Sequence, residues 1–511
     1  MVKTLKKLNN GSTRKTMILS VVIPLISCIV FMIFCMLNLN STIWFDESYS
    51  AYLVRGNFGE IWNMTSMDVH PPFFYFLLKI WSNIFGYTDF SMRFMSVFFG
   101  AMTLIFLFHL LKRWFGIKMA SIATIITAFS PMLIRYGQEM RMYTLVAFIV
   151  VAATYVLDLA LSTKKTKYYI LYGILISLGM WTHYFTAIAW IAHIVYYKFT
   201  KRGKIFDKKM LMAYILGVVL FIPWMPSLFK QVVEVQSGFW IPSISLVTPV
   251  DYLSQSLMYS EAGYATGWLV LIALAAIIPT IYFVLKFYKE QKKDGKYGFW
   301  FLIALVAVPP SILIILSLPP LTSMFIDRYI LYSAMLIWTV IGLAVFYAIS
   351  SMKQHRKDNK HKIALVALAV GVIGCVVTGI VNVTNRVPEG FVKETILAVQ
   401  AISEENEPIL MNNEWNYYDA VFYSKDKHPV YGVDEWINYQ YGSIFPIREF
   451  RYNLIDDINA FVDEHQKIWY VTDLNDASKE SKLEHEILSD NYRIVTTIAD
   501  DRLVAFELEK K

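Results

Sequence analysis

Two adjacent carboxyl groups, Asp46 and Glu47, follow the first long apolar run of the chain, inside the stretch WFDESYSAY. Acids at the edge of a membrane are costly when they are buried, so they are functional candidates by default. A carboxylate held there could accept a proton from a hydroxyl group and act as a general base. The structural alternative is that Asp46 serves as the N-cap of a helix beginning near Ser48.

The stretch DVHPP, residues 68–72, places a histidine further along the same loop. Proline favours the first turn of a helix, because the N–H that it lacks is not needed there. The apolar segment that follows is too short to span a bilayer, so we expect a helix lying in the interface. His70 either fills a structural place in that interface or donates a hydrogen bond to a phosphate oxygen.

A second polar stretch, RYGQEMRMY, covers residues 135–143. It is either a charged turn in which basic residues pair with the acid, or a part of the site. In the second case Glu139 meets Asp46 across a cavity and helps to orient a substrate, with Arg141 close by. The sequence leaves both interpretations open.

Two further candidates lie at the ends of apolar segments. Arg328 and Tyr329 begin a late one, and the guanidinium fork of arginine matches the geometry of a phosphate. The structural alternative pairs Arg328 with the neighbouring Asp327. His183 lies in a short turn between two brief apolar segments.

The chain that carries these residues is strongly apolar, with 56% hydrophobic and only 17% charged residues. Several apolar runs approach or exceed the roughly 18 residues that span a bilayer, which predicts a helical polytopic membrane protein. The first run is too long for a signal-peptide core, so we expect a retained helix. About eleven spanning helices are expected, in residues 17–39, 91–111, 118–134, 142–161, 168–182, 184–198, 210–226, 266–286, 298–317, 329–349 and 362–382.

The basic residues predict the orientation, because short cytoplasmic loops are rich in Lys and Arg. If residues 168–182 and 184–198 are two helices, the basic loops fall on the same side as the N-terminus. These segments hold 27 of the 47 Lys and Arg residues, whereas the outer loops hold seven. We therefore expect a cytoplasmic N-terminus and an extracytoplasmic C-terminus. The net charge of +7 then faces anionic lipid, and no nucleic acid partner is expected.

The unusual polar residues all fall on the predicted outer side. The loop over about residues 40–90 is long enough to hold interfacial helices, and a later outer loop carries Trp240, Asp251 and Glu261. The inner loops are lysine-rich connectors. Function is therefore expected at the outer membrane–water interface.

From about residue 384 the chain becomes polar and acidic, with 25 acidic against 13 basic residues. Alternating helical and strand patterns predict a small α/β domain outside the cell. We expect a membrane domain over residues 1–383 and this outer domain over 384–511. The expected strands are 407–413, 467–473, 492–500 and 503–509, and the expected helices are 389–406 and 456–466.

The three cysteines lie inside apolar segments, and their spacing is not that of a metal site. An outer domain without a disulfide fits a bacterial plasma membrane. The chain also ends without a signal for retention in the endoplasmic reticulum.

The order of these stretches resembles that of the membrane glycosyltransferases with the GT-C fold. WFDESYSAY, DVHPP, RYGQEMRMYTL, THY and a late RY follow one another over about residues 40–335. The most similar group is the family 39 type, which includes protein O-mannosyltransferases, aminoarabinose transferases and rhizobial lipopolysaccharide glycosyltransferases. The resemblance implies a GT-C fold with a polyprenyl-phosphate sugar as the donor.

The resemblance also implies roles for individual residues. It assigns the catalytic base to Asp46 with Glu47 beside it, and the second-loop acid to Glu139. The HPP stretch maps onto His70, and the arginine near the donor phosphate maps onto Arg328. Aminoarabinose transferases carry a lysine where His183 stands here, which is a departure from their pattern.

Both lines of argument predict an inverting transfer of a hexose or pentose to a hydroxyl of a cell-surface glycan, lipid or protein. The leaving phosphate needs no general acid, only cationic and hydrogen-bonding partners. This arrangement differs from the two separated carboxylic acids of a glycoside hydrolase. The expected phosphate partners are His70, Arg141, His183, Arg328 and Tyr329.

No cofactor is required by this chemistry. If a divalent metal were used, Asp46, Glu139 and His70 would be its ligands. The acceptor could belong to lipopolysaccharide or to a teichoic acid-like polymer.

The main rival is a transporter or flippase of lipid-linked sugars or polymers. It would show ionisable residues near the middle of the membrane and two related halves. A third interpretation is a receptor whose outer domain binds the ligand, which leaves the acids of the first outer loop without a role.

Overall fold

The structure is a computed structural model that describes residues 11–200, 207–236, 241–260, 267–385, 390–433, 453–474 and 490–511. Its internal contacts divide the chain into two compact units. The first contains residues 1–39, 93–226 and 236–386, and the second contains residues 40–92, 227–235 and 387–511. Trp240 and Glu261 lie outside the described residues.

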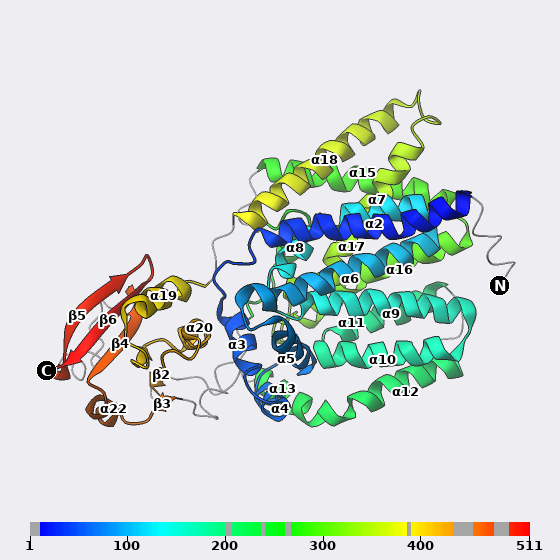
Figure 1. Ribbon diagram of the computed structural model, residues 1–511. Helices are drawn as coiled ribbons and strands as arrows, with labels where there is room; N and C mark the ends of the chain where they lie inside the picture. The colour runs from blue at the N-terminus through cyan, green and yellow to red at the C-terminus, as the bar shows by residue number, and fades with distance from the viewer. Residues whose placement is uncertain are drawn as a thin grey trace. The chain divides into compact units, whose positions relative to one another are not determined.

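The first unit consists of helices in the part that the structure describes, and the long ones run side by side (Figure 1). Their bounds are α2 Gly11–Met36, α6 Asp89–Phe115, α7 Ile117–Thr127, α8 Pro131–Gly137, α9 Tyr143–Thr163, α10 Thr166–Thr182, α11 Thr186–Thr200, α12 Lys208–Phe221, η1 Ile222–Trp224, α14 Thr248–Met258, α15 Gly267–Glu290, α16 Lys293–Leu316, η3 Asp327–Ile330, α17 Leu331–Ser350 and α18 Asn359–Thr384.

Eight helices of the described residues are long and apolar enough to cross a membrane, and a bent pair makes a ninth. The division between α10 and α11 is present, but these helices have 17 and 15 residues and fall short of a full span. The expected number of eleven spans is therefore not confirmed. The predicted class, a polytopic helical membrane protein, is confirmed.

The bent pair is α7 and α8, which meet at an angle of 62°. The bend has a local cause, because Pro131 is the first residue of α8 and cannot donate a backbone hydrogen bond to the preceding turn. After the bend the chain enters the polar stretch around Glu139. The span expected over 118–134 is therefore broken by this bend near its C-terminal end.

Small residues let the helices of this unit pack closely. A Cβ atom at Gly371 of α18 would overlap the backbone of α15 at Ala275 and Ala276. The three cysteines, Cys28, Cys35 and Cys375, are free and buried in this unit, as their apolar surroundings predicted.

The second unit combines short helices of the first outer loop with the tail of the chain. The loop helices are α3 Phe45–Leu53, α4 Phe58–Met67 and α5 Phe73–Phe85, and α13 Met225–Gln236 lies mainly in this unit. The elements of the tail are α19 Val392–Ile402, β1 Ile409–Met411, α20 Glu414–Ser424, β2 Val430–Val433, β3 Leu454–Ile455, α22 Ile458–Glu464, β4 Lys467–Asp473, β5 Tyr492–Ala499 and β6 Leu503–Lys510.

The strands form one six-stranded sheet in the order β3-β2-β1-β4-β6-β5 (Figure 1). The first four strands in this order are parallel, and β6 is antiparallel to both of its neighbours. Strand β4 is central and its middle residues are all buried, which fits its continuous apolar sequence. Strand β5 lies at the edge and is largely exposed, including its apolar residues Ile494 and Val495.

The small α/β domain expected in the tail is therefore present, with strands close to those predicted for β4, β5 and β6. The strand predicted over 407–413 is present only as β1, Ile409–Met411. The elements β2, β3 and α20 were not predicted. Short strands of two to four residues give too little alternation to be recognised from sequence. The domain boundaries 1–383 and 384–511 stay a prediction.

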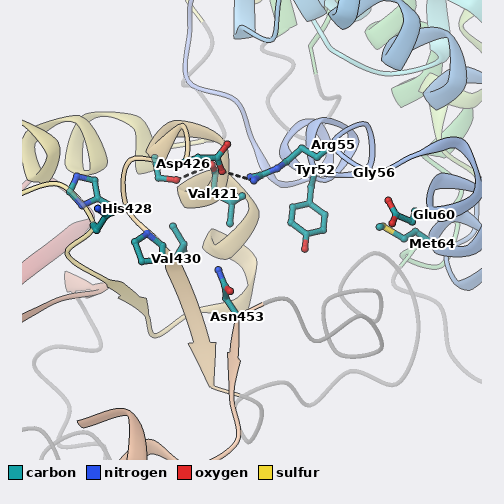
Figure 2. A pocket seen from close by; sticks show the side chains of 13 residues that line it. Tyr52, Arg55, Gly56, Glu60, Met64, Val421, Asp426, His428, Val430 and Asn453 are labelled. Atoms are coloured by element: carbon teal, nitrogen blue, oxygen red, sulfur yellow. Dashed lines mark hydrogen bonds and ion pairs between the residues drawn. The ribbon is translucent and has the colours of Figure 1, made fainter. Parts of the chain in front are cut away.

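A cavity of about 450 Å³ lies within the second unit (Figure 2). Its lining comes from the end of α3, from α4, and from α20, the start of β2 and three turns of the tail. None of its lining residues is among the candidate site residues predicted from the sequence.

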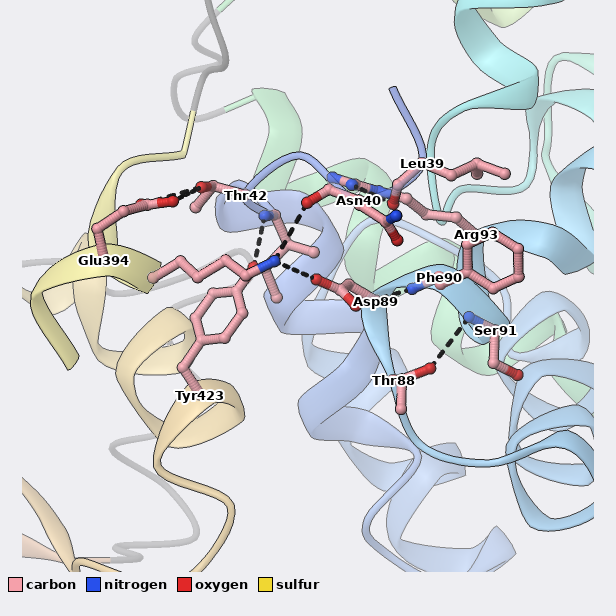
Figure 3. A network of polar contacts seen from close by, with 12 residues as sticks. Leu39, Asn40, Thr42, Thr88, Asp89, Phe90, Ser91, Arg93, Glu394 and Tyr423 are labelled. Atoms are coloured by element: carbon pink, nitrogen blue, oxygen red, sulfur yellow. Dashed lines mark hydrogen bonds and ion pairs between the residues drawn. The ribbon is translucent and has the colours of Figure 1, made fainter. Parts of the chain in front are cut away.

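Polar contacts also connect the tail to the first outer loop (Figure 3). Lys393 donates to Asp89 Oδ2 at 2.8 Å and to the Asn40 carbonyl at 3.1 Å. The Ile43 amide donates to the Tyr423 hydroxyl at 2.9 Å. The tail and the loop are thus one packed body, although they lie far apart in the sequence.

Candidate active site

Helix α3 positions the two acids of the first outer loop. It begins at Phe45 with Trp44 at the N-cap, so the suggestion that Asp46 caps a helix near Ser48 is wrong. Asp46 and Glu47 lie instead in the first turn, where the helix dipole favours negative charge. Asp46 is half-buried, whereas Glu47 is only 1% exposed.

The tail covers one face of α3 with aromatic rings. The Tyr418 ring of α20 lies 5.8 Å from Phe45, 5.6 Å from Tyr49 and 4.8 Å from Tyr52. These three residues follow the spacing of one helix face, so Tyr418 packs along the length of α3. Residues almost four hundred positions away in the sequence therefore hold the helix that carries Asp46.

A third acid, Asp419 of α20, lies buried beside these two. Its side chain hydrogen-bonds with Ser48 and lies within range of the Glu47 charge. Its Oδ1 atom has no hydrogen-bond partner among the described residues. Burial, with a smaller contribution from the negative charge of Glu47, raises the pKa of Asp419 to about 8.

The sequence argument missed Asp419. The only signal was one acid inside the aromatic stretch EWNYYDAVFYS, which nothing in the sequence connects to the first outer loop.

His70 lies in a buried pair with Asp68. The His70 Nδ1 atom is 3.2 Å from Asp68 Oδ2, and the two side chains are 10% and 1% exposed. A carboxylate at Nδ1 orients the imidazole ring and selects the tautomer that carries its proton on that nitrogen. The helix expected after Pro72 is present as α5, which begins at Phe73 and has the expected length of about 13 residues.

In the first unit, Glu139 is buried in the turn between α8 and α9. Its Oε2 accepts a hydrogen bond from Arg135 at 2.9 Å, and Arg135 also donates to the Tyr259 hydroxyl at 3.1 Å. The charged turn suggested from the sequence is thus present, with Arg135 as the partner of the acid. The suggestion that Glu139 meets Asp46 stays a prediction, since the two residues belong to different units.

Neighbouring helices hold this turn in place. Gln138 donates to the Phe34 carbonyl of α2 at 3.0 Å. Ser96 of α6 donates to the Arg141 carbonyl at 3.2 Å, and the Arg141 side chain is 2% exposed. Such a buried, bonded turn fixes the charged side chains that it carries.

Most of the residues predicted to bind the donor phosphate lie close together in the first unit. The His183 and Tyr329 rings are 4.6 Å apart, and each lies 6.4 Å from the Tyr143 ring. The Arg328 guanidinium lies over the Tyr143 ring at 5.8 Å from its centre, within the range of a cation–π contact. Three distant parts of the chain thus form one group, which we call the ring cluster: Tyr143, His183, Arg328 and Tyr329.

Sequence reasoning missed Tyr143, although it stands in RYGQEMRMY beside the predicted Arg141. It is the ring that connects Arg328 with His183 and Tyr329. Among the described residues, no group of three His, Cys, Asp or Glu side chains is arranged to hold a metal ion. Metal dependence stays untested by this arrangement.

A family model described as dolichyl-phosphate-mannose-protein mannosyltransferase matches residues 69–226. No match was found among proteins of curated function.

Solved structures resemble nearly the whole chain. ArnT from Cupriavidus metallidurans, in the apo state and bound to undecaprenyl phosphate, is 12% identical with a TM-score of 0.62, covering 95% of this chain and 97% of that one. The apo oligosaccharyltransferase of Archaeoglobus fulgidus is 12% identical with a TM-score of 0.51, covering 89% of this chain and 69% of that one. The GT-C fold expected from the sequence is therefore confirmed.

Proposed function

We propose that this chain, a membrane protein with the GT-C fold, transfers a sugar from a polyprenyl-phosphate donor to a hydroxyl of a cell-surface acceptor. The observation that carries the proposal is the ring cluster, which places the Arg328 guanidinium and His183 within one group of aromatic side chains. The guanidinium of arginine can donate two parallel hydrogen bonds to a phosphate, and the neighbouring aromatic rings can pack against a sugar. A structural relative bound to undecaprenyl phosphate supports a lipid donor of this class.

In the proposed reaction Asp46 removes the proton from the acceptor hydroxyl. The acceptor oxygen attacks the anomeric carbon from the face opposite the phosphate, and the bond between that carbon and the phosphate oxygen breaks. The phosphate leaves with the bonding electrons, and the configuration at the anomeric carbon is inverted. Arg328, His183 and Tyr329 stabilise the negative charge that develops on the phosphate, so no general acid is needed.

The remaining assignments follow from the same proposal. Glu47 and Glu139 support the site as second acids, and His70 and Arg141 contribute further hydrogen bonds to the phosphate. The chain works in a bacterial plasma membrane, with a cytoplasmic N-terminus and the tail outside. The sugar is a hexose or pentose, and the acceptor is a glycan, lipid or protein such as lipopolysaccharide or a teichoic acid-like polymer.

The experiment uses the purified full-length protein with radiolabelled polyprenyl-phosphate sugars and membrane extract as acceptor. We expect Asp46→Asn to bind the donor but to transfer about 10²–10⁴-fold more slowly, because the proton acceptor is lost. Asp251→Asn is the matched control, since Asp251 is also half-buried in the first turn of a short helix.

Each outcome has a distinct meaning. Transfer by wild type that is lost only in Asp46→Asn supports the proposal and the base. Wild-type rates in Asp46→Asn would move the base to Glu47 or Glu139. If wild type transfers no sugar from any donor, the proposal fails and transport of lipid-linked sugars is tested next.

A further inference from the structure

The cavity of the second unit lies beside the helix that carries Asp46. Tyr52 lines it, and Arg55 and Gly56 follow directly after α3. Tyr52 is six residues after Asp46, which corresponds to about 9 Å along a helix. A ligand in this cavity thus lies one short helix away from the proposed base.

The charged groups of the lining have an excess of one negative charge. Arg55 donates to Asp426 Oδ1 at 2.5 Å, and Glu60 supplies a second carboxylate. One cation against two carboxylates disfavours a ligand rich in phosphate. Figure 2 shows the Arg55–Asp426 pair at one end of the cavity and Asn453 at the opposite end, with Tyr52 and Val430 at the sides.

Several lining groups present hydrogen-bonding atoms to the cavity. Asn406 and Asn453 line it and are exposed, so their side-chain amides are accessible to a ligand, and Arg55 donates to Asp426 from one guanidinium nitrogen. His428 differs, since its two ring nitrogens lie 3.0 Å from the Glu407 carbonyl and 3.2 Å from Ser403 Oγ. The amides and the guanidinium are therefore the groups that can meet a ligand.

The backbone at the cavity is unusual as well. Asn406, Asp426 and Asn453 all line it, and all three have positive φ angles of 72°, 61° and 56°. Such angles are uncommon for residues other than glycine, although Asn and Asp tolerate them best. Three separate turns of the tail thus bring short polar side chains to one space.

We infer that this cavity binds the acceptor as a neutral glycan, with planar amide and guanidinium groups bonded to its hydroxyls and the Tyr52 ring against a sugar face. The volume of about 450 Å³ falls within the range of ligand sites. The identification of this ligand as the acceptor rests on the proposed function. The distal sugars occupy the cavity while the reacting hydroxyl reaches Asp46.

The first arm of the test measures binding without any donor. Full-length protein in detergent is mixed with neutral manno-, malto- and chito-oligosaccharides, and saturation-transfer NMR detects contact. We expect binding to weaken about five- to tenfold in Asn406→Gly and in Asn453→Gly, because each loses hydrogen bonds. Glycine keeps the positive φ without strain, so these variants retain the backbone.

Lys425→Gly is the matched control, since Lys425 also has a positive φ, of 50°, but does not line the cavity. Its binding should equal that of wild type. Three outcomes would each overturn the inference. They are the absence of any oligosaccharide signal, binding by the two asparagine variants that equals that of wild type, and a preference for glycerol phosphate oligomers.

The second arm measures transfer from the lipid donor to membrane extract. We expect both asparagine variants to raise the KM for the acceptor while donor hydrolysis in its absence stays at the wild-type rate. An unchanged acceptor KM sinks the inference but leaves the proposed function standing. No transfer by wild type, together with oligosaccharide binding that the variants weaken, would instead reject the function and keep the glycan site.

Discussion

The two groups of candidate residues are held by different kinds of contact. In the first unit, the ring cluster and the Glu139 turn are fixed by buried pairs inside a helical bundle, such as Arg135 with Glu139 at 2.9 Å. In the second unit, α3 is held from outside by the tail, through Tyr418 and Asp419. The charged side chains are thus held by ion pairs within the bundle in the first unit and by contacts with the tail in the second.

This difference predicts how much stability each group loses when one of its residues is substituted. A buried ion pair is costly to break, because removal of one partner leaves the other charge uncompensated. Helix α3, which the tail of the same unit covers, depends on many weaker contacts, of which each contributes little. We therefore expect single substitutions to cause large losses of stability in the first unit and smaller, graded losses in the contacts between α3 and the tail.

The largest effect is expected at Glu139. In Glu139→Ala, Arg135 keeps a buried charge without its carboxylate, so the loss of stability should be about 3–5 kcal/mol. Thermal unfolding in detergent measures it. Glu509→Ala breaks an exposed pair with Arg493 in the second unit and should leave the unfolding temperature unchanged. Equal losses in both variants would contradict the contrast between the units.

The next effect concerns catalysis at Arg328. We expect Arg328→Ala to slow sugar transfer about 10²–10³-fold, since the phosphate loses its cationic partner. Arg328→Lys should recover only part of the rate, because an ammonium lacks the fork. The matched control is Arg502→Ala in the second unit, where the guanidinium also lies over a ring, that of Phe391 at 5.1 Å. Steady-state assays measure the transfer rate of each variant, and Arg502→Ala should transfer at the wild-type rate.

A smaller effect is expected at Asp419 and depends on pH. Its pKa is raised to about 8 in the folded protein, above the ordinary value of 3.8, so the folded state holds a proton that the unfolded state loses. Stability from this group is complete below about pH 4 and falls as the pH rises toward 8, by a few kcal/mol at the order of magnitude.

Asp419→Asn should remove that fall, so its stability relative to wild type should increase from pH 5 to pH 8. Unfolding temperatures across this range test it, with the exposed Asp463→Asn as the control. A difference from wild type that is independent of pH would show that Asp419 is ionised in the folded protein.

The smallest effect is expected at Lys393. Lys393→Ala removes its bonds to Asp89 and Asn40, but the pair is partly exposed, so the loss should be about 0.2–1 kcal/mol. Gly390→Ala in the same contact provides the comparison, since a Cβ there would overlap the Ile43 carbonyl oxygen. If Lys393→Ala destabilises more than Gly390→Ala, the tail is held mainly by charge and not by close packing.

Local patterns made much of this structure predictable. Apolar runs gave the positions of the long helices, the prolines of DVHPP gave the start of α5, and continuous apolar residues gave β4. Each of these signals acts within a few residues, through hydrophobic burial or backbone restriction. The number of spans was less predictable, because Pro131 bends one of them and α10 and α11 are short.

The ring cluster and Asp419 required the tertiary structure. The sequence named His183 in one place and Arg328 with Tyr329 in another, but only folding brings them to the ring of Tyr143. Asp419 became a candidate only when α20 packed on α3, which no local pattern encodes. The sequence by itself determined the membrane class, the GT-C resemblance and most of the candidate side chains, since these depend on residue type and order. The tertiary structure decided which side chains meet, because burial and distance between remote segments arise only from packing.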